Sequence, residues 1–429
     1  MDRVARIALL AALVGAAACS SGPGTSTGDD PSRPASTSVS SSPNAPAPPR
    51  ASARLSRSPG GSFLVRGRYP AVGSTCVDPE RPKLLARYPG TLRVRLAEDG
   101  TLALTVIVPF DRYLEGIAEV PPSWPVAALE AQAIAARSYA LATTGWSGSE
   151  GESLDEPICA TAACQVYRGI PVPRDHAHRR WVRAVRRTDG LVLLHDGRPA
   201  TTVYFATSNG RTYGNEDVFG SDPLPYLRPV VERDDGASST SRWTVRIPLR
   251  DLERFLTRAE RWPRGRTIRA VRPSGDAVVV EGGGRSRTVA LDDLRDAMNT
   301  WAPCLEPRTY PGDLPVTIPS RWFRASSAPG ALVVTGRGWG HGAGMVQWGA
   351  YGKARRGFSA QEILAFYYGG LEPRSHPEPG TIRVVVASGL TRLVITAAGP
   401  GARLDGRRID GRHVVIEPGA VGPIVRSGG

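Results

Sequence analysis

The chain has 429 residues, with 54 lysines and arginines against 40 aspartates and glutamates, and a formal net charge of +14 at pH 7. Its hydrophobic content of 41% is enough for a sizeable core and excludes a wholly disordered protein. The positive charge is almost all arginine, and without a nucleic-acid-binding motif it predicts no nucleic-acid partner. Biased codon usage explains the arginine excess, although a basic surface would also steer the protein toward an anionic polymer.

The amino terminus has the features of an export signal. Arg3 and Arg6 precede an apolar run over residues 7–18, which is too short to span a bilayer permanently. The run ends in A-A-A-C at residues 16–19, which is similar to a bacterial lipoprotein cleavage box with Cys19 as the acylated residue. Plain signal cleavage after Ala18 is the alternative. We predict a signal peptide over residues 1–19 and a lipoprotein tethered to the outer face of the cytoplasmic membrane.

Residues 20–58 are rich in serine, proline, threonine, glycine and alanine and contain few apolar residues. Such a composition cannot bury enough surface to offset the conformational entropy lost on folding. We therefore expect a disordered linker between the membrane anchor and the folded part of the chain.

The cysteine count agrees with export. Five cysteines is an odd number, and an oxidising compartment favours pairs. If Cys19 carries the lipid, four remain, and they allow three pairings, of which Cys159–Cys164 with Cys76–Cys304 is the simplest.

The folded part begins with strand patterns. Leu92, Val94 and Leu96 alternate with polar residues, which is typical of a half-buried strand. Asp99-Gly100 predicts a turn, after which residues 102–108 return as a more apolar strand.

A pair of helices follows over residues 109–143. The first helix opens near Pro109 and is expected to end at Pro121 and Pro122, because proline disfavours the helical conformation in the residue before it. Ser123 is placed to cap the second helix. That helix is rich in alanine, which predicts a central, buried position where other segments approach closely.

Glu119 lies at the break between the two helices, between Ala118 and Val120. Burial in such an apolar corner raises the pKa of a carboxyl group, as a general acid near neutral pH requires. The alternative is a structural glutamate that caps a backbone or pairs with Arg112 or Arg137. Glu115 and Glu130 are rival carboxylates, and spacing alone does not choose among the three.

Further along, short strands alternate with helices. A basic helix is expected over residues 173–188, and a hairpin strand over residues 201–206 runs into the polar loop T-S-N-G at 207–210. Ser208 has no G-x-S-x-G elbow around it, so turn chemistry explains it without a nucleophilic role. Over residues 237–298 short strands alternate with helices, which indicates a structural scaffold or a second lobe that faces the cleft.

A glycine-rich loop follows the strand predicted at residues 331–335. Glycine stands at every second position from 336 to 344, but Ala343 occupies the place of the third glycine in the dinucleotide-binding fingerprint. The pattern instead indicates close approach of a ligand or another segment to the backbone. Trp339, His341 and Gln347 project from this region as groups suited to sugar rings, with a buried structural role as the alternative for His341.

Three stretches together resemble the SpoIID/LytB family of bacterial cell-wall proteins. They are residues 113–141, the segments C-Q-V-Y-R-G at 164–169 and Y-F-A-T-S-N-G-R-T-Y-G-N-E-D-V-F-G at 204–220, and G-R-G-W-G-H-G-A-G-M-V-Q-W-G-A-Y-G at 336–352. The resemblance covers residues 64–371 in the family's order. It implies that Glu119 is the catalytic acid and that Ser208, Asn209 and Gly210 line a glycan cleft. Some members bind zinc near Cys164, but Ala163 stands where those members have histidine, so we expect a disulfide, no metal and no cofactor.

We therefore predict an α+β fold, in which an antiparallel sheet or small barrel packs on a central helix pair and a cleft separates two lobes. The family-like domain spans residues 59–372, and a small β-rich appendage spans residues 373–429. The resemblance implies action on peptidoglycan glycan strands as a lytic transglycosylase, with a single glutamate as acid and base. The alternatives are a non-catalytic module that stimulates a cell-wall amidase and a structural envelope lipoprotein.

Overall fold

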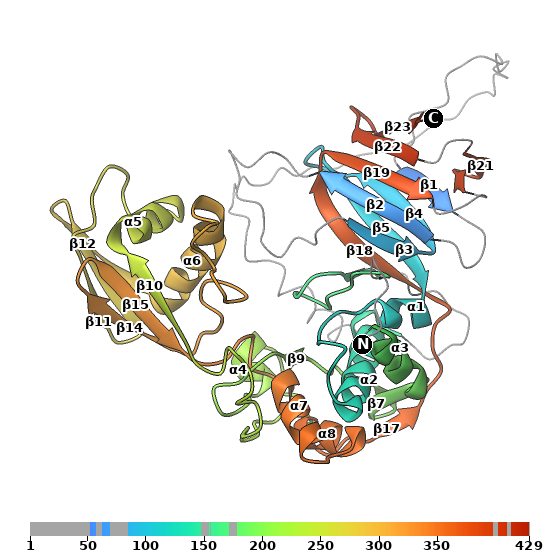
Figure 1. The fold of residues 1–429 in the computed structure, drawn as a ribbon, viewed down its shortest axis with the longest axis horizontal. Coiled ribbons are helices and arrows are strands. Elements are labelled where there is room, and N and C mark those ends of the chain that lie inside the picture. Colours follow the sequence, from blue (N-terminus) through green and yellow to red (C-terminus); the bar gives the residue numbers. More distant parts are fainter. Residues whose placement is uncertain are drawn as a thin grey trace, which may run out of the picture.

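The structure, a computed structural model, describes residues 52–56, 62–68, 85–146, 154, 156–170, 178–397, 402–409 and 413–428. Within these ranges it contains eight helices and mainly antiparallel sheets, none of which closes into a barrel. The predicted α+β class is confirmed. Figure 1 shows three parts along the chain: a β part, a central helical part and a lobe that stands away from the β part. Cys19, Cys76 and almost all of the predicted linker lie outside the described residues.

The β part consists of two open sheets built from both ends of the described chain. The seven-stranded sheet has the order β21-β20-β1-β4-β5-β18-β6, and the five-stranded sheet has the order β23-β22-β19-β2-β3. The strands of the first are β21 (Arg407–Arg408), β20 (Arg403–Leu404), β1 (Ser52–Ser56), β4 (Thr91–Leu96), β5 (Leu102–Pro109), β18 (Thr381–Leu390) and β6 (Ile158–Cys159). Those of the second are β23 (Pro423–Gly428), β22 (His413–Pro418), β19 (Arg392–Ala397), β2 (Ser62–Arg68) and β3 (Leu85–Pro89).

The alternation that predicted β4 is explained by its burial. Leu92 and Val94 are fully buried in the largest core cluster, whereas Arg95 between them and the turn is exposed.

The C-terminal strands differ from the predicted appendage. β18 pairs antiparallel with β5, and β19 pairs with β2, so residues beyond 373 complete the sheets that the N-terminal strands begin. These pairings satisfy the backbone hydrogen-bonding groups along strand edges that the N-terminal strands would otherwise leave open.

The central part packs around α2 (Val126–Thr143), which contacts α1 (Phe110–Glu115), α3 (His178–Arg187), α7 (Gln347–Arg355) and α8 (Ala360–Tyr367). Six of its eight alanines are buried, as the prediction of a central helix requires, and they let these helices approach on several sides. Two short sheets complete this part: β17 (Pro373–Ser375) with β7 (Leu191–His195) and β8 (Arg198–Pro199), and β16 (Met345–Val346) with β9 (Tyr204–Phe205). The remaining helix, α4 (Asn215–Phe219), lies beside them (Figure 1).

Two predicted helix boundaries are corrected. The first helix ends at Glu115 with Gly116 as its C-cap, well before Pro121, because the next residues pair with another segment instead of continuing the helix. The N-cap of α2 is Pro125 and makes no side-chain capping bond, so Ser123 is not the cap.

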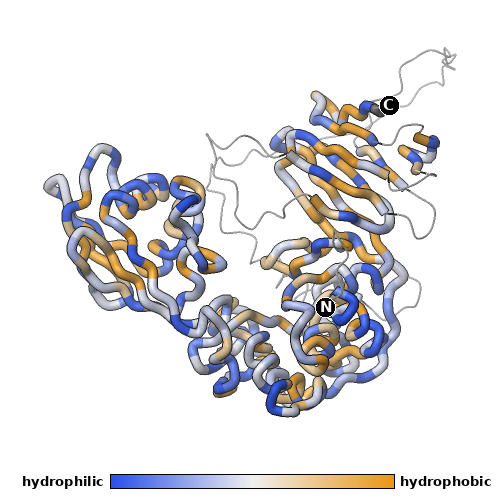
Figure 2. The backbone as a smooth tube through the Cα atoms, in the orientation of Figure 1, coloured by the Kyte–Doolittle hydropathy of each residue, from blue (hydrophilic) through white to orange (hydrophobic). Residues whose placement is uncertain are grey.

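The inserted lobe, residues 243–336, has a hydrophobic core of its own. One sheet joins β10 (Trp243–Pro248), β15 (Ala331–Gly336) and β14 (Phe323–Ala328), and another joins β11 (Ala270–Ser274), β12 (Ala277–Gly282) and β13 (Arg285–Ala290). Two helices, α5 (Leu249–Arg258) and α6 (Leu291–Leu305), pack on each other and complete it. Figure 2 shows apolar stretches both in this lobe and in the β part. Trp243 pairs with Gly336, so the chain enters and leaves the lobe at one end.

Cys159 and Cys164 form a disulfide, with their Cα atoms 5.5 Å apart. The bridge closes the loop between β6 and the C-Q-V-Y-R-G segment, and β6 is in turn paired with β18. Cys304 is also disulfide-bonded. Because Cys76 lies outside the described residues, the Cys76–Cys304 pairing stays a prediction.

Candidate active site

Glu119 is held by the segment that follows the disulfide. Ile117 forms a bridge with Tyr167, the Ala118 amide donates to the Val166 carbonyl at 2.8 Å, and the Arg168 amide donates to the Gly116 carbonyl at 2.9 Å. A Cβ atom at Gly116 would lie 2.4 Å from the Tyr167 ring, so only glycine permits this approach. Two of the motifs noted in the sequence therefore meet at this strand-like pairing, and the pairing fixes the backbone of Glu119.

Burial and hydrogen bonding act in opposite directions on the Glu119 carboxyl. Desolvation raises its pKa, and the donors around it lower it: the Val166 amide, at 2.6 Å from Oε1, and the side chains of Gln347 and Tyr204, helped by the charge of Arg168. Desolvation is the larger effect, so the pKa is raised from its ordinary value of 4.5. The carboxyl therefore keeps a proton at higher pH than an exposed glutamate, yet its anion has donors when the proton leaves.

Tyrosine side chains surround Glu119 on the central helices and on β9. Tyr113 donates to Gln165 Oε1 at 2.7 Å and is therefore fixed, while the rings of Tyr139 and Tyr204 are 6.4 Å apart. The Tyr204 hydroxyl is buried and makes no regular hydrogen bond to the residues that the structure describes. Burial also raises the pKa of Tyr204, which keeps its hydroxyl protonated. Tyr204 thus presents a protonated hydroxyl beside Glu119, which is near enough to lower the pKa of the carboxyl but makes no regular hydrogen bond with it.

An amide pair borders the same carboxyl. Gln347, the first residue of α7, donates through Nε2 to Gln132 Oε1 on α2 at 3.3 Å. Gln132 is 1% exposed, and its own Nε2 has no hydrogen-bond partner among the described residues. With Tyr204, this makes two buried polar groups near Glu119 without a regular partner, as expected where a ligand completes the bonding.

The rival carboxylates have other partners. Glu115 pairs with Arg112 at 2.7 Å and with Arg186 at 2.9 Å, and Glu130 lies 3.7 Å from Arg187. Arg137, which the sequence offered as a partner for Glu119, is fully buried and pairs with Glu378 at 2.5 Å. Because neither Arg112 nor Arg137 pairs with Glu119, the ion-pair alternative does not describe its environment. The other alternative, a glutamate that binds a backbone group, agrees with the hydrogen bond from the Val166 amide.

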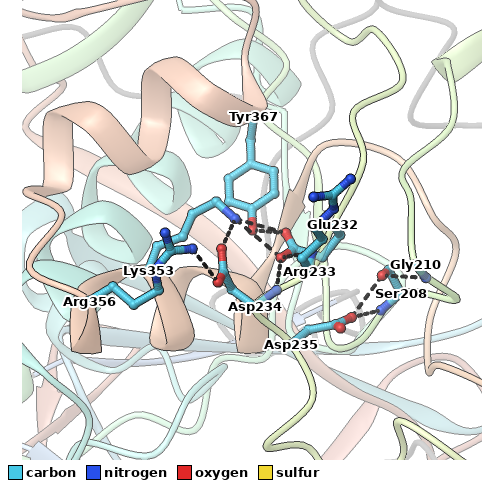
Figure 3. A network of polar contacts seen from close by, with 9 residues as sticks. All are labelled: Ser208, Gly210, Glu232, Arg233, Asp234, Asp235, Lys353, Arg356 and Tyr367. Carbon is cyan, nitrogen blue, oxygen red and sulfur yellow. Dashed lines mark hydrogen bonds and ion pairs between the residues drawn. The ribbon is translucent and has the colours of Figure 1, made fainter.

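Ser208 and Gly210 lie in a loop in which the Ser208 hydroxyl is bonded within the protein (Figure 3), whereas the buried Oδ1 of Asn209 has no partner among the described residues. The Ser208 hydroxyl donates to Asp235 Oδ2 at 2.8 Å and accepts from the Gly210 amide at 2.9 Å, and Ser208 is 3% exposed. Asn209 donates to the Tyr213 hydroxyl at 2.8 Å. Among the described residues, the side chains of Ser208 and Asn209 and the Gly210 amide bond to Asp235, Tyr213 and each other and not to Glu119, so these bonds hold the loop.

A buried ion cluster lies next to that loop. Lys353, 2% exposed on α7, donates to Glu232 at 3.2 Å and to Asp234 at 2.8 Å, and Tyr367 donates to Glu232. The Lys353 ammonium also lies 4.1 Å from the centre of the Phe366 ring. Figure 3 shows this cluster next to Asp235, which binds Ser208. The sequence did not predict this cluster.

The backbone of the glycine-rich loop lies close to another segment of the chain, which is one of the two possibilities that the sequence predicted. Glycines 338, 340, 342 and 344 all have positive φ, and the loop runs along residues 203–208. His341 accepts from the Ala343 amide through Nδ1 at 3.1 Å, so Nε2 carries the proton and donates to the Tyr204 carbonyl at 2.8 Å. Burial lowers the pKa of His341 to about 4, so the ring is neutral. His341 thus holds the backbone of β9, while Trp339 is 37% exposed.

The structure therefore brings Gln347 to Glu119 directly and His341 indirectly, through the backbone of Tyr204. Tyr204, Gln132 and the Val166 amide were missed by sequence reasoning. Tyr204 and Val166 lie inside the quoted motifs, and Gln132 is the one polar, uncharged residue among the alanines of α2 before Ser138. Among the described residues, no group of three or more His, Cys, Asp or Glu side chains is arranged to hold a metal ion.

Comparison with known proteins supports the family that the motifs predicted. Residues 98–195 match the model of the SpoIID family, described as stage II sporulation protein. An uncharacterized protein of Brachyspira hyodysenteriae is 29% identical over 61% of this chain and 65% of its own length. The amidase enhancer of Bacillus subtilis is 27% identical over 59% of this chain, and stage II sporulation protein D of the same organism is 24% identical over 62%.

The matched region covers 38% of the amidase enhancer and 74% of the sporulation protein. The chain thus spans less than two thirds of the length of the first two relatives.

Proposed function

We propose that this SpoIID/LytB-type chain acts on the bacterial cell wall, where it cleaves peptidoglycan glycan strands as a lytic transglycosylase. One observation carries the proposal: Glu119 is a buried carboxyl with a raised pKa whose anion is met by a backbone amide and two side-chain donors. Such a group can give up a proton and take it back within one reaction, which is the work of a general acid–base residue.

The proposed step needs no water. Glu119 protonates the oxygen that bridges N-acetylmuramic acid to N-acetylglucosamine, and the bond from that oxygen to the anomeric carbon breaks. The C6 hydroxyl of the same muramic acid then bonds to the anomeric carbon, and its proton passes to the Glu119 carboxylate. The products are a free 4-hydroxyl and a 1,6-anhydro end, and Glu119 is again protonated.

A two-carboxylate mechanism has less support. Ordinary glycosidases place a second carboxylate about 5–10 Å from the acid, as nucleophile or base. In the described part of the chain, the groups that shift the pKa of Glu119 include no other carboxylate, and both rivals named above are paired with arginines. A transglycosylase that uses the substrate's own hydroxyl needs only one.

Tyr204 and Gln132 are the groups we expect to contact the sugar. Each has a buried polar atom without a regular partner, and a sugar hydroxyl would satisfy it. Trp339, through its exposed ring, and Gln347, through its amide, are proposed as further glycan contacts. His341 would act by holding Tyr204, and Ser208, Asn209 and Gly210 by shaping the adjacent loop.

The second candidate is a non-catalytic module that binds glycan and stimulates a cell-wall amidase. It is favoured by one relative, which is named an amidase enhancer. The same donors around Glu119 would then hold a sugar without chemistry. In this case Glu119→Gln would leave the biological activity nearly intact.

We further propose that the protein is an exported lipoprotein with Cys19 as its lipid site. The basis is the signal-like sequence of residues 1–19, since this segment lies outside the described residues. Among the helices that the structure describes, none is long and apolar enough to cross a bilayer.

The test is to incubate the purified chain with glycan strands, both intact and stripped of peptides, and to analyse the ends by mass spectrometry. Wild-type protein should form anhydro-muramic ends, and Glu119→Gln should slow this about a hundred- to ten-thousand-fold. Glu115→Gln, which removes a carboxylate paired with arginines, is the matched control and should keep most of the activity. Wild-type protein that forms no such ends from either substrate but raises amidase activity would establish the enhancer function instead.

A further inference from the structure

A second site lies where the inserted lobe joins the central part. A pocket of 440 Å³ is lined by Arg211, Tyr213, Asp217, Arg321, Trp322 and His341. Arg321 and Trp322 directly precede β14 of the lobe, whereas the first three residues surround the start of α4. Small-molecule sites are often found at junctions between domains and commonly measure about 300–1,000 Å³.

This pocket is separate from the Glu119 site. Neighbouring residues in a strand point to opposite faces, so Tyr204 and Phe205 of β9 face different sides. Tyr204 faces Glu119, whereas the Phe205 ring lies 5.4 Å from the His341 ring and 6.3 Å from Trp322, both of which line the pocket. The two sites therefore lie on opposite faces of β9.

Aromatic rings form one wall, and the glycine-rich loop makes room for them. Tyr213 and Trp322 stack with ring centres 5.4 Å apart and planes 12° apart. Gly342, at φ +105°, lies against both: a Cβ atom there would come within 2.7 Å of the Trp322 ring and 3.2 Å of Tyr213. A glycine is thus required for this wall, which gives one glycine of the third motif a function outside the Glu119 site.

The charged groups of the pocket favour an anion. The Arg211 guanidinium lies 5.2 Å from the centre of the Tyr213 ring, and its Nε donates to the Thr212 carbonyl. Within the described part of the chain, no acceptor binds its two terminal amino groups. Arg321 has a loose ion pair with Asp292 at 3.7 Å, and the side chains of both residues are exposed to solvent. The pocket lining thus contains two guanidinium groups and one carboxylate, Asp217, while the neutral His341 ring adds no charge.

We propose that this pocket is a second carbohydrate site, which binds an acidic sugar residue carrying a carboxylate or a phosphate. Guanidinium groups bind such oxyanions through paired hydrogen bonds, and the aromatic wall offers an apolar surface to the sugar ring. Tyr213 and Trp322 already stack on each other, so no slot for a flat base lies between them. The site does not depend on the chemistry of Glu119.

The test is calorimetric titration of the full chain with three sugars: N-acetylmuramic acid, N-acetylglucosamine 6-phosphate and neutral N-acetylglucosamine. At least one acidic sugar should bind about tenfold or more tightly than the neutral one, as a charge-assisted hydrogen bond predicts. The acidic sugar that binds identifies the source, a carboxylate-bearing glycan or a phosphate-bearing polymer.

The double variant Arg211→Gln/Arg321→Gln should remove this preference. Arg324→Gln is the matched control, because Arg324 is an exposed arginine on β14 that does not line the pocket. Equal affinity for the neutral sugar, tighter binding of adenosine monophosphate, or an unchanged preference in the double variant would overturn the proposal. Thermal melting of each variant checks that it is folded.

Discussion

Replacing Glu119 with glutamine should stabilise the fold at neutral pH while it removes the proposed activity. Burial raises the pKa of the Glu119 carboxyl above 4.5, its value in an unfolded chain. Below that pH the carboxyl is neutral in both the folded and the unfolded state, so its ionisation does not change the free energy of unfolding. As the pH rises, the unfolded chain ionises first, so wild-type protein loses stability until the pH passes the raised pKa of the folded state. Glutamine is neutral throughout and escapes this loss.

The size of the effect follows from the pKa difference. Each pKa unit corresponds to about 1.4 kcal/mol of unfolding free energy. Glutamine can still accept the Val166 amide hydrogen bond, so the neutral form loses little. The advantage of the variant should therefore begin near pH 4.5, grow with pH and level off above the folded pKa.

Urea unfolding of wild type and variant between pH 4 and 8 measures this difference. The inserted lobe has its own core and can unfold separately, so hydrogen exchange of α2 peptides should report the transition. Glu115→Gln is the control with the opposite sign, because it removes two ion pairs and should lower stability by up to about 1 kcal/mol per pair. A Glu119→Gln advantage that is independent of pH, or a wild type that gains stability relative to the variant as pH rises, would refute the reasoning.

Tyr204→Phe removes a buried hydroxyl without a regular partner, so the melting temperature should be unchanged or higher. Glycan cleavage should fall, and the pKa of Glu119 in the pH–rate profile should rise, because the hydroxyl lowers that pKa. A pH–rate profile identical to that of wild type would contradict this. Lys353→Met leaves Glu232 buried without its cation and should cost about 3–5 kcal/mol of unfolding free energy, against about 1 kcal/mol or less for the exposed Arg356→Gln. Equal losses in the two variants would show that the cluster is not tightly coupled. Cys19→Ala should move the protein out of the membrane fraction, and the absence of lipid mass on wild-type Cys19 would refute the anchor.

Local patterns in the sequence predicted much of the fold. The alternation in β4 and the alanine-rich pattern of α2 depend on residues that are close together along the chain. The end of α1 at Gly116 and the absence of a Ser123 cap were not predicted, because the pairing of Ile117 with Tyr167 competes with helix continuation there. The role of β18 and β19 as central strands depends on pairings between the two ends of the chain, which no local pattern records.

The candidate site shows the same division. On the residues alone Glu119 was one of three candidate carboxylates, with Glu115 and Glu130, and the family resemblance singled it out. Its donors could not be singled out, because Val166, Tyr204 and Gln347 come from three separate segments that meet only in the fold. Ser208 was proposed for the glycan cleft because of the family resemblance, but its hydroxyl is bound by Asp235, a residue that no sequence motif connected to it.

The most direct test of the central claim is the origin of the oxygen at the new sugar end. Wild-type protein and glycan strands are incubated in water labelled with oxygen-18, and the masses of the products are measured by mass spectrometry. A transglycosylase that uses the C6 hydroxyl should give anhydro ends that lack the label and are one water lighter than hydrolysis products, and Glu119→Gln should form almost none. Labelled reducing ends would mean that water is the nucleophile and that Glu119 does not act alone.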